Sequence, residues 1–214
     1  MALQVKICGL STPETVAAAV EAGASMVGFV FYPKSPRAVS PEQAGRLVRV
    51  VPGTVSTVGL FVDPDPAEVE AVLRAVPLNV IQLHGEESPG LVAGLRQRFG
   101  LPVMKAIRVG GLEDVARAEL YMDVADRLLF DARPMRDDSL PGGNGIAFDW
   151  TLLAGRSWPL PWMLSGGLSV ANLAEAVRTT GAQALDVSSG VETSPGIKDT
   201  ALIRTFIGAV LALG

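Results

Sequence analysis

The chain has 214 residues, of which 49% are hydrophobic and 19% are charged. This composition supports a large buried core and excludes an intrinsically disordered chain. The formal net charge of -4 offers no basic footprint for nucleic acid. The apolar stretch at residues 207–213 is too short to span a bilayer, and the first residues lack the blocks of a signal peptide. We therefore expect a cytoplasmic protein with no nucleic-acid or membrane partner.

Short apolar, β-branched segments alternate with alanine-rich segments along the chain. Several apolar segments are hydrophobic at successive positions, which is typical of strands buried on both faces of a parallel sheet. The predicted strands are residues 3–7, 26–31, 57–62, 79–83, 103–107, 127–130, 162–164 and 184–187.

Helix start signals lie between these strands. Capping residues precede a proline at Thr12-Pro13, Ser40-Pro41 and Asp65-Pro66, and Ser169 and Asp199 are predicted caps of the last two helices. Eight βα units in this length fit a compact barrel, and no linker divides the chain. We predict a single-domain (β/α)8 TIM barrel over residues 1–214, with a doubly wound open sheet as the alternative.

The site of such a barrel is built at the C-terminal ends of its strands. Reactive side-chain types gather there. The polar residues that follow the predicted strands include Cys8, Lys34, Arg37, His84, Arg108, Asp131, Ser165, Ser188 and Ser189.

Glycine-containing loops follow the last two strands. Their members are Gly166 and Gly167 in one loop, and Ser188, Ser189 and Gly190 in the other. Glycines let backbone amides approach an anion closely, and these two loops are the usual phosphate cradle of this fold. The alternative is that both loops are only tight turns. We predict a phosphate-binding site.

Cys8 and Asp131 end strands that face each other across a closed barrel. A thiolate and a carboxylic acid on either side of one substrate suit the transfer of a proton from carbon to a departing oxygen. That role requires a lowered pKa for Cys8 and a raised one for Asp131. The alternatives are a small buried hydrophobe for Cys8, and a helix cap or an ion pair with Arg133 for Asp131.

Arg37 and His84 are candidate substrate-binding residues. A planar guanidinium can hold a carboxylate through two hydrogen bonds, although a loop arginine is often only solvated. The single histidine could orient substrate, carry a proton or be a hydrogen-bonded strand end. The segment Pro141-Gly142-Gly143-Asn144-Gly145 is a candidate lid or a simple turn.

Seven motifs occur in order along the chain and resemble the phosphoribosylanthranilate isomerase family of the ribulose-phosphate-binding barrels. They are Lys6-Ile7-Cys8-Gly9-Leu10, Ser35-Pro36-Arg37, Gln82-Leu83-His84-Gly85, Leu128-Leu129-Phe130-Asp131, Gly142-Gly143-Asn144-Gly145, Leu164-Ser165-Gly166-Gly167-Leu168 and Asp186-Val187-Ser188-Ser189-Gly190-Val191-Glu192. The first and the last are specific when both occur in one small barrel.

The resemblance implies an Amadori rearrangement of N-(5-phosphoribosyl)anthranilate in tryptophan biosynthesis. It implies Asp131 as general acid, Cys8 as general base and Arg37 as the ligand of the anthranilate carboxylate. The loop amides would hold the phosphate of this small sugar-phosphate substrate. No metal or organic cofactor is implied, and the role of His84 stays open.

Two alternatives remain. A sugar-phosphate isomerase of the histidine pathway performs the same rearrangement, but members of that family have two aspartates, one of them at the end of the first strand. Cys8 at that position disfavours this alternative. A non-catalytic phosphate-binding barrel would keep the glycine loops without needing Cys8 and Asp131 together.

Overall fold

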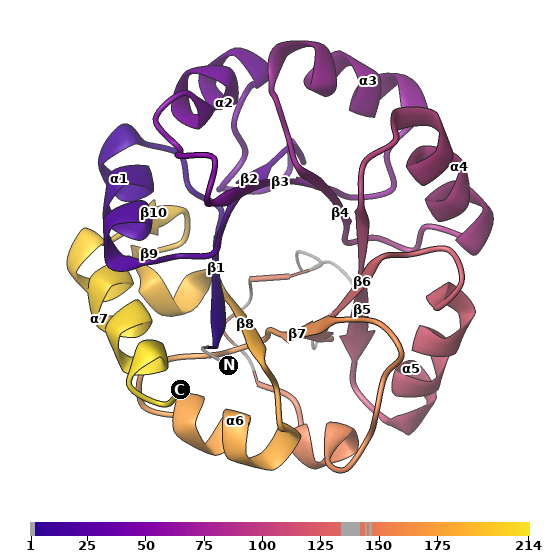
Figure 1. Cartoon of the computed structure of the whole chain (residues 1–214), viewed down its shortest axis with the longest axis vertical. Coiled ribbons are helices and arrows are strands. Elements are labelled where there is room, and N and C mark those ends of the chain that lie inside the picture. The colour runs from indigo at the N-terminus through magenta and orange to yellow at the C-terminus, as the bar shows by residue number, and fades with distance from the viewer. Residues whose placement is uncertain (1–2, 134–141, 144, 146) are drawn as a thin grey trace.

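The computed structural model describes residues 3–133, 142–143, 145 and 147–214. Within these ranges eight parallel strands follow one another around a closed barrel, and the first strand pairs with the eighth. Figure 1 shows the helices as an outer ring around this barrel. The predicted (β/α)8 TIM-barrel fold is confirmed, and the open-sheet alternative is wrong.

All eight predicted strands are present. They are β1 (Gln4–Cys8), β2 (Met26–Val30), β3 (Ser56–Phe61), β4 (Val80–Leu83), β5 (Val103–Val109), β6 (Arg127–Ala132), β7 (Trp162–Leu164) and β8 (Ala184–Val187). The first, fifth and sixth extend further than predicted, so Cys8, Arg108 and Asp131 are strand residues rather than loop residues. This places their side chains on a hydrogen-bonded, rigid backbone.

Helices connect most of the strands. The α-helices are α1 (Pro13–Ala22), α2 (Pro41–Val48), α3 (Pro66–Ala75), α4 (Pro89–Phe99), α5 (Leu112–Ala116), α6 (Leu173–Thr180) and α7 (Thr200–Leu211). Short 3-10 helices are η1 (Arg117–Tyr121), η2 (Trp150–Leu153) and η3 (Ser189–Val191). In the described residues between β6 and β7, η2 stands where a regular barrel has an α-helix.

Most of the predicted caps are confirmed. The side chains of Thr12, Ser40, Asp65 and Asp199 each accept a hydrogen bond from a backbone N–H in the first turn. The prediction for Ser169 is wrong, because α6 begins only after Asn172. The Asn172 Oδ1 atom accepts from the Ser169 N–H at 2.8 Å, which closes a separate turn ahead of the helix.

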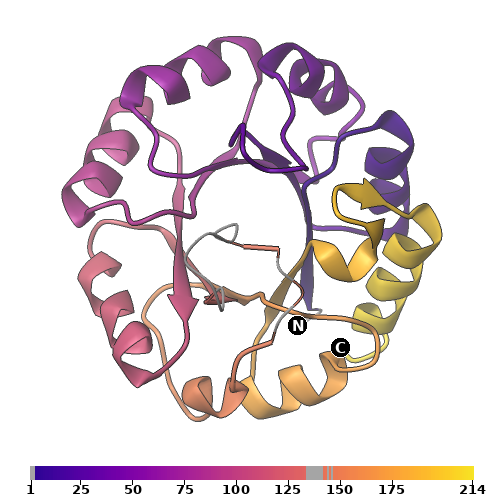
Figure 2. The ribbon, with the colours of Figure 1, turned by 180° about the vertical axis from the view of Figure 1, so that it is seen from behind.

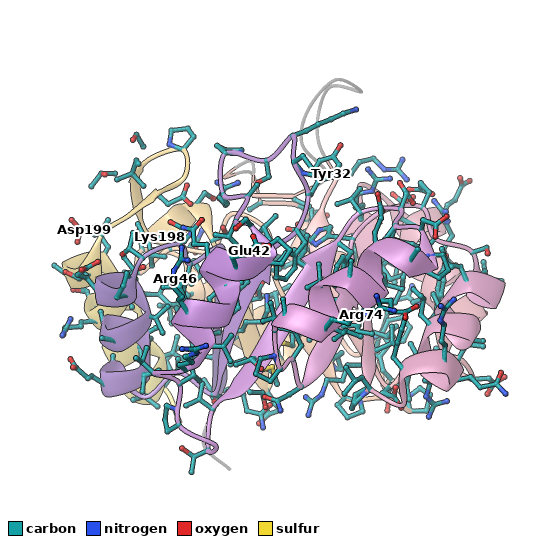
Figure 3. All side chains as sticks on the ribbon, turned by 90° about the horizontal axis from the view of Figure 1, so that it is seen from above. Tyr32, Glu42, Arg46, Arg74, Lys198 and Asp199 are labelled. Atoms are coloured by element: carbon teal, nitrogen blue, oxygen red, sulfur yellow. The ribbon has the colours of Figure 1, made fainter. Side chains whose placement is uncertain are left out.

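A small hairpin after β8 was not predicted. Its antiparallel strands are β9 (Glu192–Ser194) and β10 (Ile197–Lys198). Figure 2 shows the hairpin beside the indigo N-terminal part of the chain. Figure 3 shows it at the same end of the barrel as Tyr32. The hairpin therefore belongs to the end of the barrel that carries the C-terminal ends of the strands.

The barrel interior is filled by side chains. One buried cluster draws only on the strands β2 to β8 and consists of Met26, Val58, Val80, Met104, Ala106, Leu129, Met163 and Ala184. A larger cluster packs the outer faces of the strands against the helices. These apolar side chains fill the barrel below the C-terminal ends of its strands. In the part of the chain that the structure describes, no helix is long and apolar enough to cross a membrane.

Candidate active site

A pocket of about 760 Å³, including the solvent at its mouth, lies at the C-terminal ends of the strands. Each residue predicted to be catalytic or substrate-binding lines it. These residues are Cys8, Arg37, His84, Asp131, Gly166, Gly167, Ser188, Ser189 and Gly190. The closed barrel therefore brings residues from both ends of the chain to one cavity.

Cys8 is the last residue of β1 and is buried, with 4% of its surface exposed. A Cβ atom on Gly28, in the neighbouring strand β2, would lie 3.1 Å from the Cys8 Sγ atom and 3.2 Å from Cε of Lys6. The glycine leaves the space in which both side chains lie. Burial fits the alternative of a small hydrophobe, but the position in the pocket wall also fits a reactive thiol.

A buried ion pair lies below Cys8 and was missed in the sequence. The Lys6 ammonium is fully buried and lies 2.8 Å from Oδ1 of Asp186, at the end of β8. The Ser165 hydroxyl donates to the other Asp186 oxygen at 3.1 Å. Lys6 precedes Cys8 by two residues, so both side chains point to the same face of β1. A lysine between the apolar residues Val5 and Ile7 of a predicted strand was the available signal.

The lowered pKa that we expected for Cys8 is wrong for this structure. Burial raises the pKa of the thiol above its ordinary value, and the nearby Lys6 ammonium offsets this only in part. Burial also disfavours the charge on Lys6, but the attraction of Asp186 and of Cys8 outweighs it and raises the pKa of the ammonium. Lys6 therefore stays charged and is available to stabilise a thiolate.

Asp131 faces His84 rather than Arg133. Its Oδ2 atom lies 3.0 Å from the His84 Nε2 atom, and its Oδ1 atom accepts from the Ala132 N–H at 2.9 Å. Arg133 instead pairs with Asp114. The proposed ion pair between Asp131 and Arg133 is therefore wrong, and Asp131 is 3% exposed within the pocket wall.

Two glycines keep the Asp131 carboxyl group accessible. A Cβ atom on Gly142 would lie 2.6 Å from its Oδ2 atom, and one on Gly166 would lie 3.0 Å from its Oδ1 atom. Gly166 also has φ of +88°, a conformation that favours glycine. Any side chain at either position would press on the carboxyl group.

Arg37 is buried rather than solvated, with 5% of its surface exposed. Its Nε and Nη2 atoms donate to the two carboxylate oxygens of Glu192 at 2.7 and 2.8 Å. Nη2 also donates to the Gly143 carbonyl at 3.0 Å. Lys198 contacts the same carboxylate at 2.5 Å, and together these cations hold the pKa of Glu192 below its ordinary value despite burial. Sequence reasoning missed Glu192 and Lys198 because the hairpin that carries them was not predicted.

The two glycine loops lie against each other. A Cβ atom on Gly190 would come within 2.0 Å of the Leu168 carbonyl oxygen, so these backbones approach as only glycine allows. The Ser188 hydroxyl donates to the Cys8 carbonyl at 3.1 Å, which ties the second loop to β1. Both loops line the pocket beside Cys8, as a shared anion cradle requires.

Some predicted rim residues lie elsewhere. Lys34 is exposed, and Arg108 pairs with Glu86 outside the pocket. Of the candidate lid, Pro141 and Asn144 lie outside the described residues, whereas Gly142 and Gly143 line the pocket. No group of three or more His, Cys, Asp or Glu residues within the described ranges could hold a metal ion.

Known proteins resemble this chain over its full length. The sequence profile of the family described as N-(5'phosphoribosyl)anthranilate (PRA) isomerase matches residues 5–209. The N-(5'-phosphoribosyl)anthranilate isomerase of Rhodospirillum centenum is 59% identical over 214 residues, covering 100% of both chains.

Solved structures agree. The phosphoribosyl anthranilate isomerase of Thermotoga maritima has a TM-score of 0.86 at 38% identity, covering 99% of this chain and 100% of that one. Another such isomerase, in complex with reduced 1-(o-carboxyphenylamino)-1-deoxyribulose 5-phosphate, has a TM-score of 0.84 at 38% identity with the same coverage. The chain belongs to the N-(5'-phosphoribosyl)anthranilate isomerase family.

Proposed function

We propose that Cys8 and Asp131 carry out the proton transfers of this family's reaction from opposite sides of the pocket. The chain is an N-(5'-phosphoribosyl)anthranilate isomerase of tryptophan biosynthesis. Asp131 protonates the furanose ring oxygen, and the bond from that oxygen to C1 breaks to give a Schiff base. Cys8 then removes the proton from C2, and the resulting enolamine tautomerises to the ketone.

The observation that carries this assignment is the position of the two groups. β1 and β6 are separated by β7 and β8 in the closed barrel, and Cys8 and Asp131 both line the pocket at the C-terminal ends of the strands. A substrate held between them would have one group on each side. The Lys6 ammonium supports the thiolate form of Cys8, which is the form that accepts a proton.

Arg37 binds the anthranilate carboxylate in this proposal. Glu192 takes the Nε and Nη2 groups, and within the described residues Nη1 has no hydrogen-bond partner. The second amino group of the guanidinium is therefore free to donate to the substrate. Because Glu192 holds the guanidinium plane through two bonds, Arg37 presents that group in one fixed direction.

The glycine loops bind the phosphate. Backbone amides of Gly166, Gly167, Ser188, Ser189 and Gly190 are the proposed ligands, since these residues line the pocket. His84 holds the Asp131 carboxyl group through the 3.0 Å contact. None of these steps calls for a metal or an organic cofactor. We also expect the enzyme to work in the cytoplasm.

The test is the fluorescence decay of phosphoribosylanthranilate, formed freshly from anthranilate and phosphoribosyl pyrophosphate. General acids and bases contribute about 10²- to 10⁴-fold each, so Cys8→Ala and Asp131→Asn should each lose at least about 100-fold in kcat. Binding of inorganic phosphate should stay within a fewfold of wild type, which controls for folding. Activity near that of wild type in either variant would remove that residue from its role.

The histidine-pathway isomerase performs the same rearrangement on a different substrate, so its substrate is the specificity control. The same protein assayed with the histidine-pathway aminoaldose separates the two. Turnover of only that substrate would overturn the assigned specificity and with it the role of Arg37.

A further inference from the structure

The Asp131–His84 pair continues into a third side chain that the proposed mechanism does not use. Gln82 lies two residues before His84 and is fully buried in β4. Its Nε2 atom lies 3.0 Å from the His84 Nδ1 atom. Its Oε1 atom is buried and has no hydrogen-bond partner among the described residues. A buried orphan oxygen beside a hydrogen-bonded histidine calls for an explanation.

With the Gln82 amide oriented so that Nε2 faces His84, these contacts place the imidazole proton on the other ring nitrogen. An amide Nε2 group can only donate, so the His84 Nδ1 atom must be the acceptor. The ring proton is then on Nε2, which donates to Oδ2 of Asp131. In this arrangement both Asp131 oxygens accept hydrogen bonds, Oδ2 from His84 and Oδ1 from the Ala132 N–H. The carboxyl group needs a further proton before it can act as the general acid.

When the His84–Asp131 pair takes up one proton, the contact of His84 with Asp131 and its contact with Gln82 both change. A proton on Oδ2 of Asp131 donates to Nε2 and leaves the ring hydrogen on Nδ1, and an imidazolium carries a hydrogen on both nitrogens. In both forms the Nδ1 atom carries a hydrogen. A protonated Nδ1 atom needs an acceptor, and the nearest group is again the amide of Gln82. Rotation of that amide by half a turn exchanges Nε2 for Oε1 and supplies the acceptor.

We infer that Gln82 is a positioning residue that stabilises both protonation states of the His84–Asp131 pair by rotating its amide. The inference rests on the proposed role of Asp131. Because glutamine both donates and accepts, one side chain serves the resting form and the proton-loaded form. The orphan oxygen of the resting form is the acceptor that the loaded form uses.

The neighbouring charges do not replace this function. Arg133 pairs with Asp114, Arg108 with Glu86, and Lys105 with Glu87, so the cations around the pair are already neutralised. Across the pocket Arg37 pairs with Glu192, and Lys6 pairs with Asp186 beneath Cys8. Among the contacts that the structure describes, the Nδ1 side of His84 is reached only by Gln82.

The test is a ¹⁵N NMR pH titration of histidine-labelled protein. His84 is the only histidine, so the spectrum contains one pair of ring nitrogens and needs no assignment among residues. Wild type should carry its proton on Nε2 at the alkaline end. The variants are Gln82→Met, which can neither donate nor accept, and Gln82→Glu, which only accepts. Gln183→Glu adds the same charge at an exposed position before β8 and is the matched control.

The two variants should move the titration midpoint in opposite directions. Gln82→Met loses the stronger bond in the two-proton state, so its midpoint should fall by about one pH unit. Gln82→Glu favours that state, and its midpoint should rise by about one pH unit or more. The alkaline limb of kcat/KM should follow the same shifts, and Gln183→Glu should match wild type.

Three results would overturn the inference: a wild-type proton on Nδ1 at alkaline pH, shifts of the same sign in both variants, or no shift. A wild-type proton on Nδ1 overturns the inference even if neither variant folds. Because the titration needs no turnover, an inactive wild type would count against the proposed function and not against the role of Gln82.

Discussion

Removal of the Lys6 ammonium should lower the free energy of unfolding by a large part of its value. Lys6→Met keeps the apolar stem but leaves the Asp186 carboxylate in the barrel without its cation, which lay 2.8 Å away. At an effective dielectric constant of about 20, two charges at that distance attract by about 6 kcal/mol. Desolvation of the pair cancels much of this, and loss of one partner of a buried pair costs about 3–5 kcal/mol. Domains of this kind are stable by only about 5–15 kcal/mol.

The double variant Lys6→Met/Asp186→Asn leaves no lone charge behind. We therefore expect its free energy of unfolding to lie above that of Lys6→Met, even though it carries one more substitution. The control is Arg204→Met, which breaks an exposed ion pair with Glu21 and should cost no more than about 1 kcal/mol.

Urea denaturation followed by tryptophan fluorescence measures these differences. Trp158 and Trp162 pack against Phe130 at centroid distances of 4.9 and 5.6 Å, so their emission reports the loss of barrel packing. A cost below about 1 kcal/mol for Lys6→Met, or additive costs in the double variant, would refute the reasoning.

Three further predictions concern the same end of the barrel. In the folded protein the pKa of Lys6 lies above its ordinary value of 10.5. The ion pair therefore stabilises the fold fully below pH 10.5, and this stabilisation is lost as the pH rises through the folded pKa. Urea denaturation at increasing alkaline pH should show a steeper loss of unfolding free energy in wild type than in Lys6→Met/Asp186→Asn. Glu192→Gln should raise KM about tenfold with kcat within a fewfold, because Arg37 loses its charged clamp; an equal loss of inorganic phosphate affinity would contradict this. Gly166→Ala should cost at least about 1 kcal/mol in urea and at least about tenfold in kcat, because φ there is +88°; wild-type values for both would show that the loop adapts.

The sequence predicted features that depend on neighbouring residues. Each strand was visible as a run of apolar residues, and Thr12, Ser40, Asp65 and Asp199 were recognisable as caps because a cap and its helix lie within four residues. Ser169 failed because Asn172, three residues later, closes a turn that delays the helix. Local chemistry thus predicts that a helix exists better than it predicts the residue at which the helix begins.

The site residues were predicted because the barrel rule converts strand ends into neighbours. That rule gathers Cys8, His84 and Asp131 at one pocket without any knowledge of their contacts. It does not say which side chains pair. The bond between Arg37 and Glu192 joins positions 155 residues apart, and no local pattern encodes it.

The pKa of Cys8 could not be predicted for a related reason. The pKa of a thiol at a strand end can be raised or lowered, depending on burial and on the charges that the fold brings near it. Burial in the assembled barrel raises the pKa most, and the nearest charges are Lys6, which is local, and Asp186, which comes from the other end of the chain. Only the assembled barrel sets their balance.

The bond between Lys6 and Asp186 spans 180 residues and joins the first strand of the barrel to its eighth. A nascent chain emerges from the ribosome with Lys6 early and with its counter-ion only near the end of synthesis. Until then β1 has no partner on one edge, and its lysine cannot be buried without an opposing charge. Pairings between such distant segments form slowly, because the entropy of loop closure must be lost before the contacts contribute any favourable free energy. The pairing of β1 with β8 that closes the barrel therefore also brings the thiol beside the second phosphate loop.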